Sequence, residues 1–452
     1  MGIIMCNKSG TRQQIVILGG GPAGLTAGYY AQKKNLPFTI YEQKDLVGGN
    51  SITLKHEDFM FDSGAHLLLD KDPRVTKEIF EILENHLNKI SLPLQTYYDG
   101  KLVDFPFSPL NLMVNLGIWK FIKSNFEIAT KKFRKRSAPD NFTNYVKHVY
   151  GETISDLFLL NYSEKLWGKS CSDLSSKIAG KLLTGFTFKT FLIELWRGRG
   201  AKIQHTVGNM YYPEKGFGAI MEKIAQRCGP ENIRINSKIT KILHDDNEIR
   251  LIEINGREKL KTGFVVSTIP LNLFIQLMDP TPSKDILTTA KSLQFRDLIL
   301  VTLFLDRETV TDSASIHFPN PDFSITRIHE PKNRNKSMAP TGKTSLVAEI
   351  PCFEGDRIWL KKDKDLIQQV SSELSSMGWI ATGEILDGVV SRLHHAYPIL
   401  DLNYQNKIKK LRNFLDGFDN LKITGRTGAF EYLSFHHIMR ASEKIIDTIP
   451  IH

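Results

Sequence analysis

The feature that most constrains the fold of this chain is a glycine-rich turn near its N-terminus. Residues 15–18 are all apolar and predict a buried strand directly before the turn. Gly19, Gly21 and Gly24 then give the spacing GxGxxG, and the residues that follow have a helical pattern as far as position 32. A second strand over 38–41 comes next. This order of elements predicts a Rossmann-type unit in an α/β protein.

Each part of the unit has a physical role in binding a dinucleotide. Glycines permit a tight turn and let the N-terminus of the helix approach a pyrophosphate. Glu42 follows the second strand, where an acid would accept a hydrogen bond from a ribose hydroxyl. The alternative is a glycine-rich turn of some other α/β protein, but here the strand, helix, second strand and acid all follow in order.

The residues after the acid indicate FAD rather than NAD. The stretch EQKDLVGGN supplies Gly48, Gly49 and Asn50 soon after Glu42. This extended motif resembles the FAD motif of the amine oxidase and protoporphyrinogen oxidase superfamily. The resemblance implies FAD as the cofactor, bound at the N-terminal Rossmann unit and at a second segment near the C-terminus.

The stretch LKITGRTGAF fits that second segment. Its first four residues predict a strand, and Gly425, Arg426 and Gly428 predict a turn after it. A helix expected over 436–447 could direct its N-terminus at the flavin. The alternative for the two glycines is an ordinary hairpin turn.

An arginine in the stretch FSITRIHEPK raises a separate question. The stretch is rich in β-branched residues and stopped by a proline, so a strand is expected there. Alternation along a strand puts Arg327 on the same face as Phe323 and Ile325. A buried arginine needs a negative partner. The partner is either an internal carboxylate, Glu330 or Glu349, or an anionic ligand.

Four further stretches, NYSEKLWG, SITRIHEPK, AYPI and GRTGAFEY, resemble segments of the UDP-galactopyranose mutases, a group within this flavoprotein superfamily. In that family the matching arginine and two later tyrosines hold the substrate diphosphate. The resemblance therefore implies that Arg327, Tyr397 and Tyr432 grip a nucleotide-linked or lipid-linked sugar diphosphate, which suits a forked guanidinium. Tyr162 and Trp167 match the ends of another motif, and Trp167 either walls the sugar or uracil pocket or lies in the core.

His66, in the stretch FDSGAHLLL, is the one candidate for a catalytic side chain. In the resembled family this segment runs close to the flavin ring, where a histidine could tune the flavin or contact the substrate. The alternative is a polar residue satisfied by backbone groups. Phe217 and Ser434 stand where the mutases have a tyrosine and an aspartate. These two departures weaken the expectation of a galactose substrate more than the expectation of a flavin-binding fold.

The same patterns predict two discontinuous domains. A Rossmann-type FAD-binding domain is expected from residues 1–95, 205–290 and 385–452. An α+β substrate domain is expected from a helical insert at 100–200 and a mixed sheet at 295–385.

Charge favours anionic partners, because 59 basic residues exceed 49 acidic ones and the net charge is +10. Nucleic acid is not expected, since there is a single dense basic cluster, KKFRKR. That cluster ends a run, 110–136, that is apolar with interspersed lysines. The run could rest peripherally on the inner face of a membrane, or form a solvated helix end. No run approaches the roughly 18 apolar residues of a spanning helix.

The cysteines predict neither disulfides nor a metal site. Cys6, Cys171, Cys228 and Cys352 are widely scattered, with no metal-ligand spacing. We expect reduced thiols in a cytoplasmic protein. The N-terminal MGIIMC lacks the apolar core and cleavage site of a signal peptide.

Three functions are compatible with these patterns. The first is a mutase-like enzyme in which, by resemblance, N5 of reduced FAD attacks the anomeric carbon of a diphosphate-linked sugar. The second is an FAD-dependent oxidase or dehydrogenase of the protoporphyrinogen oxidase or amine oxidase type, in which oxidised FAD takes a hydride. The third is a flavin-binding protein without activity, which would have lost Arg327, Tyr397 and Tyr432. The substrate, the electron partner and the oligomeric state are left open.

Overall fold

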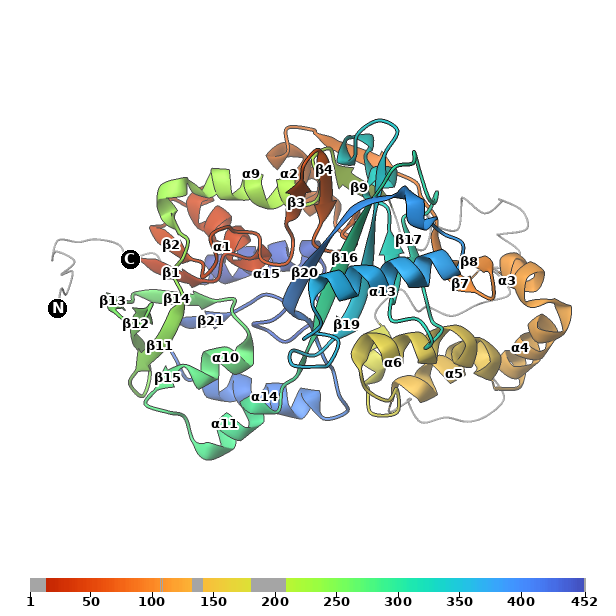
Figure 1. Ribbon diagram of the computed structural model, residues 1–452. Coiled ribbons are helices and arrows are strands. Elements are labelled where there is room, and N and C mark those ends of the chain that lie inside the picture. Colours follow the sequence, from red (N-terminus) through yellow and green to blue (C-terminus); the bar gives the residue numbers. More distant parts are fainter. Residues whose placement is uncertain (1–13, 106, 108, 132–140, 180–208, 451–452) are drawn as a thin grey trace.

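The computed structural model describes the 452-residue chain except for residues 1–13, 106, 108, 132–140, 180–208 and 451–452. Within the described residues, a parallel sheet and a larger mixed sheet lie side by side, and a group of helices extends beyond the mixed sheet (Figure 1). The fold is α/β, with a Rossmann-like parallel sheet and a second, mixed sheet, as predicted. The domain boundaries expected from the sequence stay predictions.

The parallel sheet has the strand order β10-β2-β1-β14-β21, and all its described pairings are parallel. Its strands are β1 Ile15–Leu18, β2 Phe38–Tyr41, β10 Ile233–Arg234, β14 Phe264–Ser267 and β21 Leu421–Ile423. The side chains of β1 alternate between two cores. Ile15 and Ile17 pack with the helices on one face, and Val16 and Leu18 pack toward the other. The all-apolar strand is therefore a central strand buried on both faces.

Helices cover the first face, and a small sheet with further helices covers the second (Figure 1). The first face carries α1 Pro22–Lys33, α2 Pro73–Ile82, α9 Gly218–Cys228 and α15 Phe435–Asp447. The second carries the sheet β13-β12-β11-β15 and three helices. Those elements are β11 Ile239–His244, β12 Ile249–Ile254, β13 Glu258–Lys261, β15 Met278–Asp279, α10 Leu271–Gln276, α11 Lys284–Lys291 and α14 Tyr404–Leu415.

The mixed sheet has the order β20-β16-β19-β18-β17-β7-β8. Its long central strands are buried throughout, and helix α13 Asp363–Ser376 packs on one face of them. The hairpin of β3 Thr53–His56 and β4 Phe59–Asp62 packs on the other face. The strands are β7 Leu94–Tyr98, β8 Lys101–Phe105, β16 Phe295–Leu305, β17 Ser315–His317, β18 Arg327–His329, β19 Thr344–Cys352 and β20 Ile385–Pro398.

A helical group follows β8 and shares a core of its own. It consists of α3 Pro109–Leu116, α4 Ile118–Lys131, α5 Phe142–Ile154, a π-helix Ser155–Leu160 and α6 Asn161–Trp167. These helices fall inside the insert predicted at 100–200, of which residues 180–208 lie outside the described chain. The remaining short elements are β5 Leu68–Leu69, β6 Leu87–Ile90, β9 Met210–Pro213 and α12 Pro331–Arg334.

The strand predicted over FSITRIHEPK is wrong in its first half. Strand β18 begins only at Arg327, so the predicted alternation with Phe323 and Ile325 does not hold. The backbone N–H groups of Ser324 and Ile325 donate to the carboxylate of Glu373 on α13, at 2.9 and 3.4 Å. A side chain from a distant helix therefore replaces the neighbouring strand that these groups would need.

Candidate active site

The nucleotide end of the candidate site is the turn between β1 and α1. Helix α1 begins at Pro22, earlier than the sequence predicted, and no side chain caps its N-terminus. A Cβ on Gly24 would lie 1.8 Å from the carbonyl oxygen of Gly19, so only glycine fits there. The carboxylate of Glu42 accepts hydrogen bonds from the N–H of Gly20 at 2.6 Å and of Lys44 at 2.9 Å. The acid is thus fixed beside the turn.

Two other glycine segments converge on the start of α1. A Cβ on Gly49 would lie 3.1 Å from Cα of Gly21, and one on Gly425 would lie 2.8 Å from Cβ of Ala23. Residues far apart in the sequence therefore leave bare backbone around the first turn of α1, where N–H groups and the helix dipole favour an anion. This cradle fits the pyrophosphate of a dinucleotide. The binding roles of Gly19, Gly21, Gly24, Glu42, Gly48, Gly49, Asn50, Gly425 and Arg426 stay predictions.

His66 lies between this cradle and the mixed sheet. Its Nε2 is 2.8 Å from the carbonyl oxygen of Asn50, which can only accept, so Nε2 carries the proton. Burial and the nearby guanidinium groups of Arg426, Arg334 and Arg327 lower the pKa of His66 to about 3, against the hydrogen bond to Asn50. The ring is neutral at physiological pH and backbone-satisfied. It is therefore suited to holding a neighbour in place rather than to acid catalysis.

Arg327 finds its negative partner inside the protein. It lies opposite Glu349 in the register of β18 and β19. Its Nε donates to Oε2 of Glu349 at 3.0 Å, and its Nη2 donates to both carboxylate oxygens at 2.8 and 2.7 Å. Glu330, the other carboxylate considered, instead accepts from the N–H groups of Val310 and Thr311. The burial of Arg327 is thus explained without a bound ligand.

Four aromatic side chains predicted to bind substrate do gather around this pair. Trp167 contacts Tyr397 and Tyr432 edge-on, with ring centroids 6.0 and 6.3 Å apart, and the two tyrosines are 5.9 Å apart. Trp167 is 6% exposed and Tyr432 is 54% exposed. Burial raises the pKa of Tyr162, whose neighbours include Arg327 and Glu349. The cluster therefore has a buried base and an open rim. Trp167 lies in the core of the helical group, and its role as a wall of a sugar or uracil pocket stays a prediction.

The charge of this site is unbalanced. Arg327 is matched by Glu349, and Arg334 lies 3.9 Å from Asp62. Arg426 donates to the carbonyl of Leu433 at 2.9 Å, and its guanidinium lies 5.1 Å from the ring centroid of Tyr432. No hydrogen bond from Arg426 to a carboxylate occurs in the described part of the chain. Of these three arginines, Arg426 at the rim is therefore the one without a carboxylate partner in the described residues, and its charge favours an anionic ligand.

Sequence reasoning missed two residues of the site. His317 lies opposite Arg327 in the register of β17 and β18, with its ring 5.2 Å from that of Tyr162. Burial, with Arg327 beside it, lowers the pKa of His317 to about 3. Lys165 donates from Nζ to the carbonyls of Phe318, Asn320 and Ile325 at 2.7 to 2.9 Å. Of these two residues, only Lys165 could have been found from the sequence, because it lies inside the motif NYSEKLWG.

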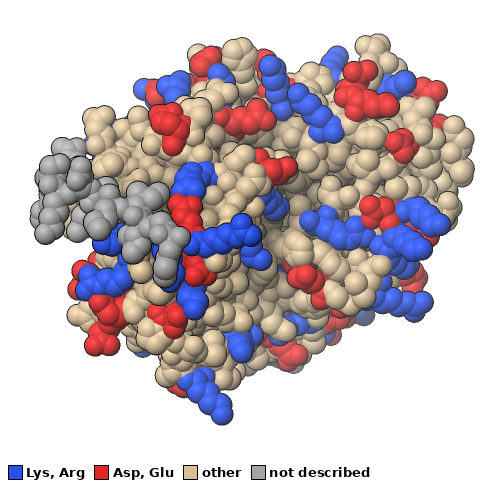
Figure 2. Space-filling model, turned by 60° about the vertical axis from the view of Figure 1, so that its left-hand side comes forward, with Lys and Arg blue, Asp and Glu red and all other residues tan. Residues whose placement is uncertain are grey.

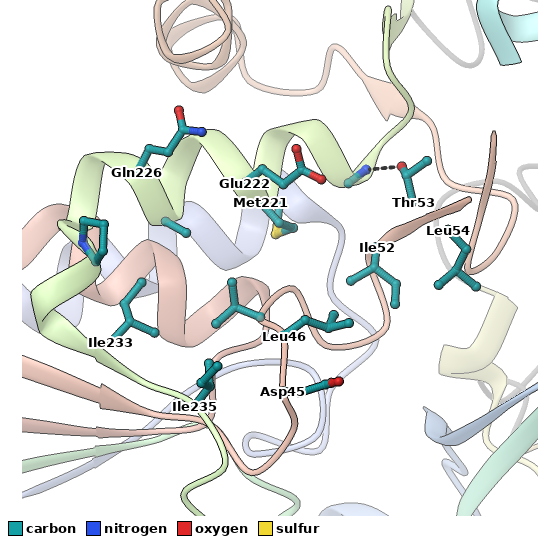
Figure 3. Close-up of a pocket in the computed structure, with 14 residues that line it drawn as sticks. Asp45, Leu46, Ile52, Thr53, Leu54, Met221, Glu222, Gln226, Ile233 and Ile235 are labelled. Atoms are coloured by element: carbon teal, nitrogen blue, oxygen red, sulfur yellow. Dashed lines mark hydrogen bonds between the residues drawn. The ribbon is translucent and has the colours of Figure 1, made fainter. Parts of the chain in front are cut away.

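A cavity of about 540 Å³ lies beside the cradle but outside this cluster (Figure 3). It is enclosed by the segment 45–54, by α9 and by residues 230–235, and the N–H of Gly218 donates to Thr53 at its end. Its lining is mainly apolar, with Leu46, Ile52 and Met221 among the side chains that face it. None of the residues predicted to bind substrate lines it.

The remaining predictions concern thiols, metals, membrane spans and surface charge in the described residues. Cys171, Cys228 and Cys352 are free and buried, and no group of histidine, cysteine or acidic residues there could hold a metal ion. None of the described helices is long and apolar enough to cross a membrane. Figure 2 shows basic and acidic side chains interspersed over one face of the molecule.

Comparison with known proteins identifies the family. Residues 22–400 match the model of the flavin containing amine oxidoreductases, and the chain belongs to this family. Coproporphyrinogen III oxidase of Bacillus subtilis is 24% identical over 92% of this chain and 93% of its own length.

Two solved structures share the fold over nearly the whole chain. A reduced UDP-galactopyranose mutase has a TM-score of 0.85 and 19% identity, covering 96% of this chain and 95% of its own. A protein described as a putative protoporphyrinogen oxidase from Exiguobacterium has a TM-score of 0.77 and 18% identity, covering 98% and 99%. Sequence relatives and family together support a flavin-dependent oxidoreductase class, and at these identities the structural likenesses concern the fold alone.

Proposed function

We propose that this chain is an FAD-dependent oxidoreductase whose anionic substrate binds in the aromatic cluster beside the flavin. The observation that carries the proposal is the convergence of three separate glycine segments on the uncapped start of α1, with the aromatic cluster next to it. Bound FAD would supply the hydride acceptor for an oxidation. The residues described above would bind the cofactor and position the substrate.

The chain would hold the cofactor at two ends. The turn from Gly19 to Gly24 would receive the pyrophosphate, and Glu42 would accept from a ribose hydroxyl. The neutral pair of His66 and the Asn50 carbonyl would line the flavin end. Since His66 keeps its proton on Nε2 and has a pKa of about 3, its role is to position rather than to donate a proton.

The substrate would lie between the tyrosines and the excess charge of Arg426. Tyr397 and Tyr432 offer hydroxyl groups and ring faces, and Trp167 closes the base of the cluster. The ion pair of Arg327 with Glu349 is close to neutral, which weighs against a strong diphosphate clamp at that position. The single excess charge of Arg426 is enough to pair with one carboxylate of an oxidase substrate.

A mutase-like reaction on a nucleotide-linked or lipid-linked sugar diphosphate is the second candidate. It is favoured by the gathering of Arg327, Tyr162, Tyr397 and Tyr432 in one cluster, as the resemblance implied. In this candidate Arg327 and Arg426 would together hold the diphosphate while the tyrosines position the sugar.

Anaerobic incubation of the purified flavoprotein distinguishes the two candidates. Coproporphyrinogen III and UDP-galactofuranose are each mixed with oxidised and with dithionite-reduced protein. Bleaching of the oxidised flavin by the first compound, with oxidised product recovered, supports the oxidoreductase. Conversion of the second compound to UDP-galactopyranose only by reduced protein establishes the mutase and overturns the leading proposal. If neither compound reacts, amine and other carboxylate-bearing hydride donors are screened by the same bleaching assay.

A further inference from the structure

An exposed apolar face lies at the end of the helical group, on α3 and α4. Trp119 is 82% exposed, Phe126 68%, Val114 67%, Ile118 57% and Ile122 52%. In Figure 1 these two helices lie at the end of the molecule away from the parallel sheet. A soluble surface seldom groups five large apolar side chains in this way, so the face calls for a partner.

The apolar residues of α4 form one stripe. At 100° per residue, Ile118, Trp119, Ile122 and Phe126 fall within an arc of about 100°. The opposite side of α4 packs on α5, with Ser124 buried. The helix is therefore already anchored to the protein by one face, and its apolar stripe is a second face directed outward.

The charges around the stripe have one sign. Lys123 is exposed beside the stripe, whereas α3 carries no charged residue. Lys120 is also exposed, but it is turned back toward the mixed sheet, where its Nζ donates to the hydroxyl of Tyr98 at 3.4 Å. The acid of α4, Glu127, is turned toward α5, where its carboxylate accepts from the N–H and the hydroxyl of Thr153, both at 2.9 Å. An apolar stripe that meets water with a flanking lysine and no free carboxylate on either helix complements a surface with an apolar interior and anionic headgroups.

We propose that the outer face of α3 and α4 is a peripheral docking surface for an anionic lipid bilayer. Trp119 and Phe126 would enter the boundary between headgroups and acyl chains, and Lys123 would contact the phosphates. A second copy of the chain is the weaker occupant, because a symmetric contact would bring Lys123 of the two copies together with no free carboxylate on either helix to pair with it. The part of the predicted membrane segment beyond residue 131 lies outside the described residues.

Flotation of the full-length, flavin-loaded protein with lipid vesicles tests this proposal. We expect binding to vesicles of phosphatidylcholine mixed with phosphatidylglycerol and much weaker binding to phosphatidylcholine alone. The double variant Trp119→Ser/Phe126→Ser should reduce the partition coefficient about tenfold or more, because two aromatic anchors are lost. Lys123→Glu should weaken the preference for phosphatidylglycerol.

Leu360→Ser is the matched control, since Leu360 is 72% exposed on another part of the surface. It should leave partitioning unchanged, and flavin content should be equal in all variants. The proposal is overturned if the wild-type protein does not bind anionic vesicles, or if Leu360→Ser weakens binding as much as the aromatic variant. It is also overturned if the protein forms dimers that Trp119→Ser dissociates, which would make a second copy the occupant.

Discussion

Replacement of Glu349 by glutamine should lower stability and raise anion affinity at the same time. Glu349 is 2% exposed and forms the ion pair that satisfies Arg327, whose side chain is 21% exposed. Removing one partner of a buried pair costs about 3–5 kcal/mol, because the other charge is left uncompensated. Glutamine keeps one oxygen that can accept from Arg327 and from the N–H of Ala65, which Glu349 now accepts at 3.2 Å. We therefore expect a loss of about 2–3 kcal/mol.

The effect on anions has the opposite sign. Loss of the carboxylate adds one positive charge to a cluster that already has the excess charge of Arg426. Charges about 6 Å apart at an effective dielectric constant of about 20 interact by about 3 kcal/mol before salt screening. With screening, we expect inorganic pyrophosphate to bind the flavin-loaded variant about tenfold more tightly than the wild-type protein.

Denaturant unfolding and titration calorimetry with pyrophosphate measure the two effects. Glu354→Gln is the control, because Glu354 is 64% exposed in a surface pair with His394 and should cost less than about 1 kcal/mol. The double variant Arg327→Met/Glu349→Gln should be more stable than the sum of the single effects predicts. The reasoning is refuted if Glu349→Gln is no more destabilising than the control, or if pyrophosphate binds it more weakly.

Three other substitutions test separate parts of the site. Gly24→Ala should reduce the flavin bound to the protein, measured by absorbance, at least about tenfold, because the new Cβ would lie 1.8 Å from the carbonyl oxygen of Gly19. Gly383→Ala is the control and should retain flavin, since no atom lies within 4 Å of its Cβ. His317 has a folded-state pKa of about 3 against an ordinary 6.5, so between these values the unfolded chain binds a proton that the folded protein refuses. The free energy of unfolding should therefore fall as pH falls through this window, by up to about 1.4 kcal/mol per pH unit. His317→Asn should make the free energy of unfolding depend less steeply on pH, and equal slopes for the variant and the wild-type protein would contradict this. Lys165→Met should release the three carbonyls that precede Arg327. For the compound that reacts in the anaerobic assay, it should raise KM more than it lowers kcat, and an unchanged KM would count against that role.

The glycine cradle was predictable because its main parts are neighbours in the sequence. The strand, the glycine turn, the helix and Glu42 are consecutive, so one short stretch contains the whole pattern and its steric demands. The family model and the fold bear out the class that this stretch indicates. The helix ending at Asp447 was also predicted to within one residue at its start, because its pattern is local.

The substrate cluster could be predicted only in part. The residues around Arg327 were grouped through motif resemblance, but sequence could not choose between Glu330 and Glu349 as its partner. That choice depends on the register of β18 with β19, which pairs positions 22 residues apart. The missed contact with His317 depends likewise on the register of β17, and the strand predicted from Phe323 was displaced by the carboxylate of Glu373.

Consecutive residues therefore specified the Rossmann unit, the flavin class of the chain and the residues available for an anion site. The packing of the fold settled which charges neutralise one another, which histidines are kept neutral and which face of α4 is left exposed. The physical reason is that glycine turns and helix patterns express interactions between near neighbours. Charge pairing and burial instead depend on the distance between side chains that strand register and helix packing bring together.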